Sequence, residues 1–184
     1  GKKRGSGFTI NKKLFHKKCM TIIPAIDIRN GNCVRLTQGD FSQEKIFSND
    51  PVAMAKYWES QGVKKLHIVD LDGAKTGEVK HFAVIKKIMN TIAIPAQVGG
   101  GIRDERTIEK LLAIGIKNII LGTLAVENKK VLKNILKQYS ENIIIALDVK
   151  GELLLSQGWL TVTRKHLFET IKELENNGIK KIIY

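Results

Sequence analysis

Short apolar runs rich in β-branched residues recur along the chain from residue 22 onward. Each run is apolar at consecutive positions, which is typical of parallel strands that are covered on both faces. Helix-like patterns lie between the runs, and Asp50-Pro51, Asp104 and Thr163 are start signals for three of them. This alternation predicts an α/β fold with a parallel sheet. We expect strands at 22–27, 66–71, 94–98, 118–121 and 143–148, helices over 105–114 and 164–176, and helix ends at Gly62, Gly115 and Gly178.

The pattern also repeats at long range. Residues 23–29 (IPAIDIR) return as residues 144–150 (IIALDVK), and residues 61–66 (QGVKKL) return as residues 177–182 (NGIKKI). The spacing between the copies corresponds to about four βα units of roughly 30 residues each. We therefore predict a (β/α)8 TIM barrel built from duplicated half-barrels, truncated here after about strand six.

Composition narrows the class of protein. A chain of 184 residues with 43% hydrophobic content can form one buried core, and no apolar stretch reaches the ~20 residues of a membrane helix. Much of the net charge of +13 falls in residues 1–19, which carry basic but no acidic side chains. The other lysines lack interleaved aromatic residues, which argues against nucleic-acid binding. We expect a basic tail or non-native segment at 1–19 and one partial barrel domain at 20–184.

The two cysteines add a further limit. Cys19 and Cys33 provide neither a disulfide framework nor the spacing of a zinc site. We therefore expect a cytoplasmic protein without a structural metal.

The repeat matches two aspartates. Asp27 ends the first predicted strand and Asp148 ends the fifth, so in a barrel both carboxylates reach the face that carries active sites, from opposite sides. Paired carboxylates of this kind suit proton transfer at two positions of a substrate. The alternative is structural, because a strand-end aspartate can cap a loop or pair with a cation such as Arg29 or Lys150.

Glycines follow the third and fourth strands. Gly99-Gly100-Gly101 comes directly after strand three, and Gly122-Thr123 comes after strand four. Glycines let backbone N–H groups approach an anion closely, and the threonine adds a hydroxyl donor. The combination predicts a phosphate site, whereas the triple glycine alone is also consistent with a tight turn.

Six other residues are considered for a role at the site. Asp70 and Asp72 flank the end of strand two, where they line the pocket mouth or fix the following loop. Trp159 is either a platform for stacking a heterocycle or a packing aromatic. His67, inside an apolar strand, is interpreted as a core or interface histidine. His81 and His166 are expected on helix surfaces.

From residue 20 to residue 184 the chain resembles the phosphoribosylformimino-5-aminoimidazole carboxamide ribotide isomerases of histidine biosynthesis. The resemblance rests on a set of motifs that together are highly specific. They are IPAIDIRNG at 23–31, CVRL at 33–36, QGD at 38–40, HIVDLDGA at 67–74, QVGGGIR at 97–103, LGT at 121–123, ALD at 146–148 and GW at 158–159.

The resemblance implies an Amadori rearrangement of a bisphosphorylated substrate, without metal or organic cofactor. It implies that Asp27 is the general base at C2 of the ribose and that Asp148 is the acid that opens the ring. One substrate phosphate would then lie at Gly100, Gly101, Gly122 and Thr123, and Arg103 and Trp159 would contact the substrate. The second phosphate site would belong to strands seven and eight, which this sequence lacks.

Three alternatives remain at this point. The sister cyclase of the same pathway shares the duplicated barrel, although its resemblance to residues 25–29 and 72–77 is poorer. Some isomerases of this kind also act on phosphoribosylanthranilate. A non-catalytic, phosphate-binding half-barrel is the third.

We expect a monomer when the barrel is complete, and association together with at least ~10³-fold lower activity for a chain truncated at residue 184, because half of the phosphate clamp is absent.

Overall fold

The computed structural model describes residues 20–37, 39–151, 153–156 and 161–184. Its main sheet has eight strands in the order β11-β7-β6-β5-β4-β1-β2-β3. The pairs from β11 to β1 are parallel, and β2 and β3 extend the sheet antiparallel beside β1. The strands are β1 (Ala25–Arg29), β2 (Asn32–Thr37), β3 (Asp40–Ser48), β4 (Leu66–Asp70), β5 (Ala96–Gly99), β6 (Asn118–Leu121), β7 (Ile143–Ala146) and β11 (Ile182–Ile183).

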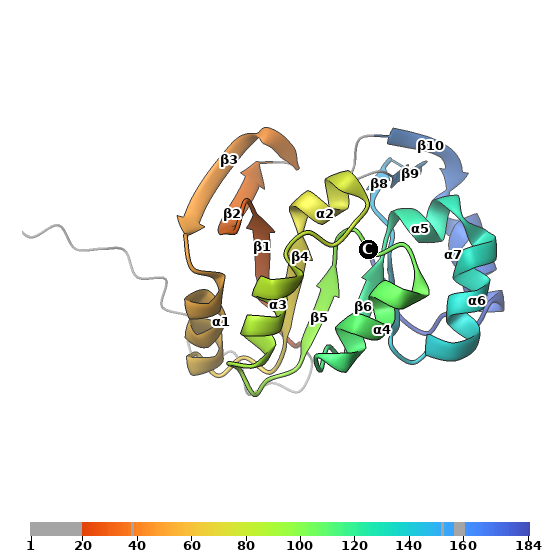
Figure 1. Ribbon diagram of the computed structural model, residues 1–184. Helices are drawn as coiled ribbons and strands as arrows, with labels where there is room; N and C mark the ends of the chain where they lie inside the picture. The colour runs from red at the N-terminus through yellow and green to blue at the C-terminus, as the bar shows by residue number, and fades with distance from the viewer. Residues whose placement is uncertain (1–19, 38, 152, 157–160) are drawn as a thin grey trace, which may run out of the picture.

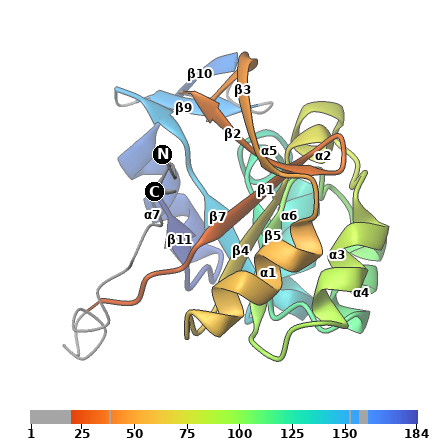
Figure 2. The same cartoon turned by 90° about the vertical axis from the view of Figure 1, so that its left-hand side faces the viewer.

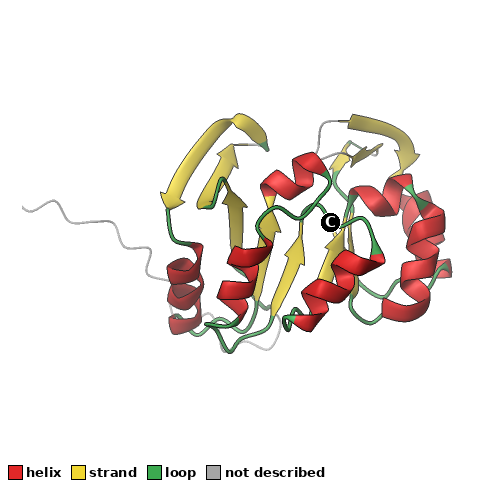
Figure 3. Cartoon of the chain, viewed as in Figure 1, coloured by secondary structure: helices red, strands yellow, loops and turns green. Residues whose placement is uncertain are grey.

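The sheet is curled into part of a barrel, with helices along its convex side (Figures 1 and 2). Figure 1 shows the carboxyl ends of the parallel strands pointing toward the top of the view, where α2 and the antiparallel strands lie. Figure 3 shows the alternation of strand and helix that the sequence predicts. The helices are α1 (Pro51–Ser60), α2 (Leu71–Thr76), α3 (Phe82–Met89), α4 (Glu105–Ala113), α5 (Thr123–Glu127), α6 (Lys129–Tyr139) and α7 (Leu167–Asn176). The α/β fold with a barrel-like parallel sheet is thus confirmed.

The register separates two faces of the sheet. One row of paired residues has at most 2% of its surface exposed and packs in the core: Ile26, Ile68, Val98, Ile119 and Ile143. The next row along the strands belongs to the opposite, concave face, because successive side chains of a strand alternate: Asp27, Val69, Gly99, Ile120 and Ile144. The buried apolar residues of the predicted strands therefore pack against the helices. Residues that are candidates for catalysis, such as Asp27, lie on the concave side.

The predicted helix boundaries are confirmed at several positions. The carboxylate of Asp50 accepts hydrogen bonds from the N–H groups of Val52 and Ala53, and Asp104 accepts one from Thr107. The glycines expected to end helices have positive φ values that favour glycine: Gly62 81°, Gly115 91° and Gly178 85°.

The predicted helix over 164–176 begins too early. Helix α7 starts at Leu167, and β10 (Thr161–His166) precedes it, so Thr163 is not a helix cap. β10 pairs with β9 (Leu153–Ser156), which pairs with β8 (Val149–Lys150) in a small antiparallel sheet. β-branched residues at 161–163 favour extended backbone, and pairing with β9 fixes it.

The first strand also differs from its prediction of 22–27. It covers Ala25–Arg29, because β2 pairs with residues 27–29 and prolongs the strand beyond the barrel. The pairing of β2 with β3 was not apparent from the apolar pattern. In the described part of the chain no helix is long and apolar enough to cross a membrane.

We expect Ile68→Ala to lower the free energy of unfolding by about 2–5 kcal/mol, because it leaves a cavity between sheet and helices. Urea denaturation monitored by circular dichroism measures this. Ile46→Ala is a matched control, since the Ile46 side chain on β3 is 56% exposed and should change stability far less. Equal losses in the two variants would contradict the assignment of faces.

Candidate active site

A pocket of about 200 Å³ lies at the carboxyl ends of β4, β5, β6 and β7. The loops after β5, β6 and β7 contribute residues to its wall, and so does strand β4 itself. The lining includes His67, Val69, Gly99, Gly100, Gly101, Arg103, Gly122, Thr123, Ala146 and Asp148. Carboxyl ends of parallel strands are where barrel enzymes carry their active sites. The structure thus brings together the four predicted phosphate-binding residues, the predicted substrate contact Arg103 and one predicted catalytic aspartate.

Gly100 and Gly101 adopt a backbone that other residues would strain. Their φ values are 104° and 76°. A Cβ on Gly100 would lie 2.1 Å from the carbonyl oxygen of Asp70, and one on Gly101 would lie 2.5 Å from the carbonyl carbon of Glu78. Packing against the turn after β4 therefore explains both glycines without any ligand. The tight turn and the pocket lining are two properties of the same loop.

Gly122 is different, because space around it is open. A Cβ built there would meet only the carbonyl oxygen of Ala146, at 3.9 Å. Gly122 precedes α5, whose first residue, Thr123, also lines the pocket. The missing side chain at Gly122 therefore leaves space in the pocket, although the packing around it does not require a glycine.

Arg103 lies at the rim of the pocket with an exposed side chain. Its guanidinium packs against Gly77, where a Cβ would lie 2.6 Å from Cζ of Arg103. Gly77 ends α2 with a φ of 83°. The cation is therefore held beside the end of α2 while it still reaches the pocket.

Asp148 follows β7, is exposed and lines the pocket. Its carbonyl oxygen accepts a hydrogen bond from the N–H of Leu155 at 2.7 Å, and Leu155 also lines the pocket. The hairpin of β8 and β9 is thus anchored at the residue predicted to be the acid.

Asp27 lies on β1, half-buried, and is paired with Val69 of β4. Val69 lines the pocket, whereas Asp27 is not among the lining residues. Burial raises the pKa of Asp27 above its ordinary value, and the positive charge of Arg35 opposes this shift without cancelling it. The register places Asp27 on the concave face, and β1 and β7 are four positions apart in the sheet. The geometry agrees with an aspartate on each side of the concave face but does not join them in one cavity.

Asp70 is fully buried and accepts three backbone hydrogen bonds. One carboxylate oxygen binds the N–H of Gly73 at 2.7 Å, and the other binds those of Lys80 at 2.7 Å and His81 at 2.8 Å. The expected strand continuation past Asp70 is wrong, because helix α2 begins at Leu71 and Asp70 is its N-cap. These contacts favour the structural role that the sequence left open beside substrate binding.

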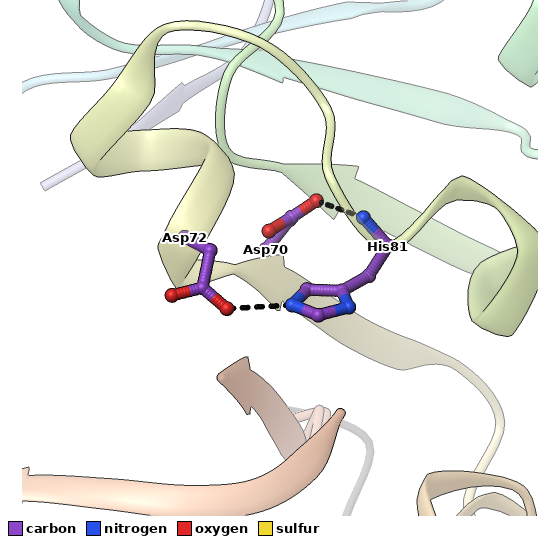
Figure 4. Close-up of side chains that lie close together, drawn as sticks. All are labelled: Asp70, Asp72 and His81. Carbon is purple, nitrogen blue, oxygen red and sulfur yellow. Dashed lines mark hydrogen bonds and ion pairs between the residues drawn. The ribbon is translucent and has the colours of Figure 1, made fainter. Parts of the chain in front are cut away.

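Asp72 and His81 form an ion pair that the sequence did not suggest (Figure 4). His81 Nε2 lies 2.6 Å from Asp72 Oδ2, which also accepts the N–H of Asn30 at 2.7 Å. The His81 side chain is only 15% exposed, so its expected place on a helix surface is wrong. Burial raises the pKa of Asp72, but the hydrogen bonds from His81 and Asn30 and the charges of His81 and Arg29 outweigh it, so the pKa lies below its usual range.

Asp70, Asp72 and His81 also lie close enough together to suggest a metal site, since their ligand atoms are within 4.8 Å of one another. Both oxygens of Asp70 already accept N–H groups, and His81 is bonded to Asp72. The cluster is therefore explained as a hydrogen-bond network that joins the β4–α2 turn, the start of α3 and the β1–β2 turn.

Two predicted residues add little. Trp159 lies outside the described residues. His166 is exposed at the residue before α7. His67, interpreted from the sequence as a core or interface histidine, is half-buried and lines the pocket.

We expect Asp70→Asn to lower the free energy of unfolding by roughly 3 kcal/mol, because an amide NH₂ would face buried N–H donors that now bind a carboxylate oxygen. Thermal or urea unfolding measures the loss. Asp40→Asn is the control, because Asp40 is exposed and its carboxylate accepts hydrogen bonds from Ser42 and Gln43, two and three residues later. A fully stable Asp70→Asn protein would show that the three backbone contacts do not hold the turn.

Residues 21–184 match the family model described as histidine biosynthesis protein. A relative from Dehalococcoides mccartyi (strain CBDB1) is 45% identical over 163 residues, which are 89% of this chain and 67% of the relative. Relatives from Oceanobacillus iheyensis and from Clostridium botulinum (strain Kyoto) are 46% and 44% identical over 165 residues, which are 90% of this chain and 69% and 68% of those proteins.

All three relatives carry the name 1-(5-phosphoribosyl)-5-((5-phosphoribosylamino)methylideneamino)imidazole-4-carboxamide isomerase. The matched region contains every described residue of the pocket. The chain therefore belongs to the histidine biosynthesis protein family and, within it, to the isomerases.

Proposed function

We propose that this chain belongs to an enzyme that converts the phosphoribosylformimino aminoimidazole carboxamide ribotide to its phosphoribulosyl form in histidine biosynthesis. The observation that carries the proposal is that Asp148, Thr123 and the glycine loop (residues 99–101) line one pocket. The chain that forms this pocket is 44–46% identical to proteins named as this isomerase. The reaction is an intramolecular aldose–ketose isomerisation.

A substrate phosphate binds at the glycine loop in this proposal. Gly100 and Gly101 present backbone from the loop after β5, and Gly122 and Thr123 present it from the loop after β6. Arg103 adds a positive charge at the rim. Fixing one end of the substrate in this way holds the ribose beside Asp148 and lowers the entropic cost of reaching the reactive geometry.

The two aspartates then carry the protons of the rearrangement. Asp148 donates a proton to the ring oxygen as its bond to C1 breaks, which opens the ribose. Asp27 removes the proton from C2 and leaves an enolamine. In the ketonisation the C2 hydroxyl gives its proton to the Asp148 carboxylate and C1 takes the proton held by Asp27, so a carbonyl forms at C2 and both aspartates return to their starting states. The product is an isomer of the substrate, so no oxidant or reductant is consumed.

The environment of Asp27 supports its part as the base. Burial raises its pKa, which makes the carboxylate a stronger proton acceptor than an exposed aspartate. The base must be ionised to act. Activity that depends on Asp27 is therefore retained above its raised pKa and lost as the pH falls through it.

We expect Asp27→Asn or Asp148→Asn, in the full-length natural protein, to lower kcat by a factor of about 10²–10⁴ with a much smaller change in KM, because each removes one proton-transfer group. Steady-state isomerase assays measure both constants, and Asp104→Asn, which retains an N-cap oxygen at α4, is the control. Retention of most of the turnover in either variant would remove that residue from the mechanism.

Assaying phosphoribosylanthranilate in parallel decides whether the enzyme has a second substrate.

We expect Gly122→Ala and Thr123→Val to weaken binding of inorganic phosphate by roughly 1–3 kcal/mol in isothermal titration of the 184-residue chain, because one fills the open space and the other deletes a hydroxyl. The fold should survive both changes. Gly101→Ala is unsuitable for this test, since its Cβ would collide with Glu78 and disturb the turn itself. Unchanged phosphate binding in both variants would contradict the assigned site, and phosphate binding without isomerase activity in the full-length protein would favour a non-catalytic half-barrel.

A further inference from the structure

His67, which lines the pocket, lies next to Gln97 in the sheet. They are paired residues of the parallel strands β4 and β5, so their side chains share the concave face of the sheet. Gln97 is buried, with 4% of its surface exposed, and His67 is half-buried and lines the pocket. Neither residue is used in the proton transfers described above.

One contact fixes the state of the imidazole. Nε2 of Gln97 lies 2.8 Å from Nδ1 of His67. An amide nitrogen donates and does not accept, so with the Gln97 amide in this orientation Nδ1 accepts and the neutral ring carries its proton on Nε2.

The surroundings keep the ring neutral. Burial lowers the pKa of His67, and the positive charge of Lys65, the residue before β4, lowers it further. The ammonium of Lys65 donates a hydrogen bond to Oδ1 of Asn118, the first residue of β6, at 2.7 Å. At neutral pH the imidazole is therefore an uncharged ring with one N–H donor.

That donor is available to a ligand. Within the described residues Nε2 of His67 has no hydrogen-bond partner. No buried side-chain nitrogen or oxygen in this part of the chain lacks a partner, so Nε2 is reached by solvent. His67 also lines the pocket in which a substrate would lie.

We propose that Gln97 is a positioning residue that holds His67 as the Nε2–H tautomer, so that the ring donates a hydrogen bond to an oxygen of the bound phosphoribosyl group. The proposal rests on the isomerase function proposed above. A neutral donor holds a sugar oxygen without adding a charge that would change the proton affinity of Asp27 or Asp148. It also matches the ketone product, whose new C2 oxygen accepts a hydrogen bond but cannot donate one.

The first test reads the tautomer without any activity. Side-chain ¹⁵N chemical shifts of labelled full-length protein distinguish Nε2–H from Nδ1–H, and His67→Gln identifies the His67 signals. We expect Nε2–H in the parent protein. In Gln97→Glu, whose carboxylate can only accept, we expect a proton on Nδ1 and a higher pKa of the ring. A parent protein with Nδ1–H would overturn the proposal whether or not the enzyme is an isomerase.

The second test asks whether Gln97 acts through His67. We expect Gln97→Leu and His67→Leu each to lower kcat/KM about tenfold, and the double variant to be no worse than His67→Leu alone. His67→Gln should recover part of the loss, because its amide keeps a donor near the position of Nε2. Additive losses in the double variant would overturn the positioning role. A parent that has the expected tautomer but no isomerase activity would instead overturn the proposed function and leave the tautomer assignment standing.

Discussion

Close backbone contact between the turn after β4 and the loop after β5 determines the shape of this protein's pocket. Gly73, Gly100 and Gly101 fit together so tightly that a Cβ on any of them would come within about 3 Å of the other segment or of Glu78. The carboxylate of Asp70 holds one side of this contact through its three N–H partners. A buried charge is stable there because both of its oxygens are satisfied. Without that network the turn would lose its fixed shape, and the glycine loop would have nothing to pack against.

The same turn reaches the other side of the concave face. Asp72, two residues after Asp70, accepts the N–H of Asn30 in the turn that follows β1 and pairs with His81 at the start of α3. Arg29, also at the end of β1, is held by the carbonyl of Phe41 and the carboxylate of Glu44 on β3. The strand that carries Asp27 is therefore tied at its carboxyl end to the turn that packs against the glycine loop after β5. The strand that carries the proposed base and the loop proposed to bind phosphate are thus held by the same hydrogen-bond network around Asp70 and Asp72.

Elements with strong local signals could be predicted from the sequence. The strand at 118–121 and the caps Asp50 and Asp104 agree with the structure, because apolar runs and capping residues act within a few positions. The helix start at Thr163 failed because pairing between β9 and β10 decides that segment, and such pairing leaves no local trace. The role of Asp70 was not predictable for a related reason: three of its partners lie 3 to 11 residues away in a turn whose shape only the folded chain defines. The place of His67 in the pocket follows from which face of β4 is concave, and an apolar strand covered on both faces does not reveal that.

The interlocked glycines divide the pocket into parts that differ in their freedom to vary during evolution. A side chain at Gly73, Gly100 or Gly101 would require the facing backbone to move, so we expect this wall to tolerate few single substitutions. Gly122 and Arg103 face open space or solvent, and each can be exchanged while the backbone around it keeps its shape. Mutations that adapt the pocket to a different sugar phosphate would therefore be expected on the β6 side and at the rim. The wall formed by the turn after β4 and the loop after β5 would be expected to stay the same.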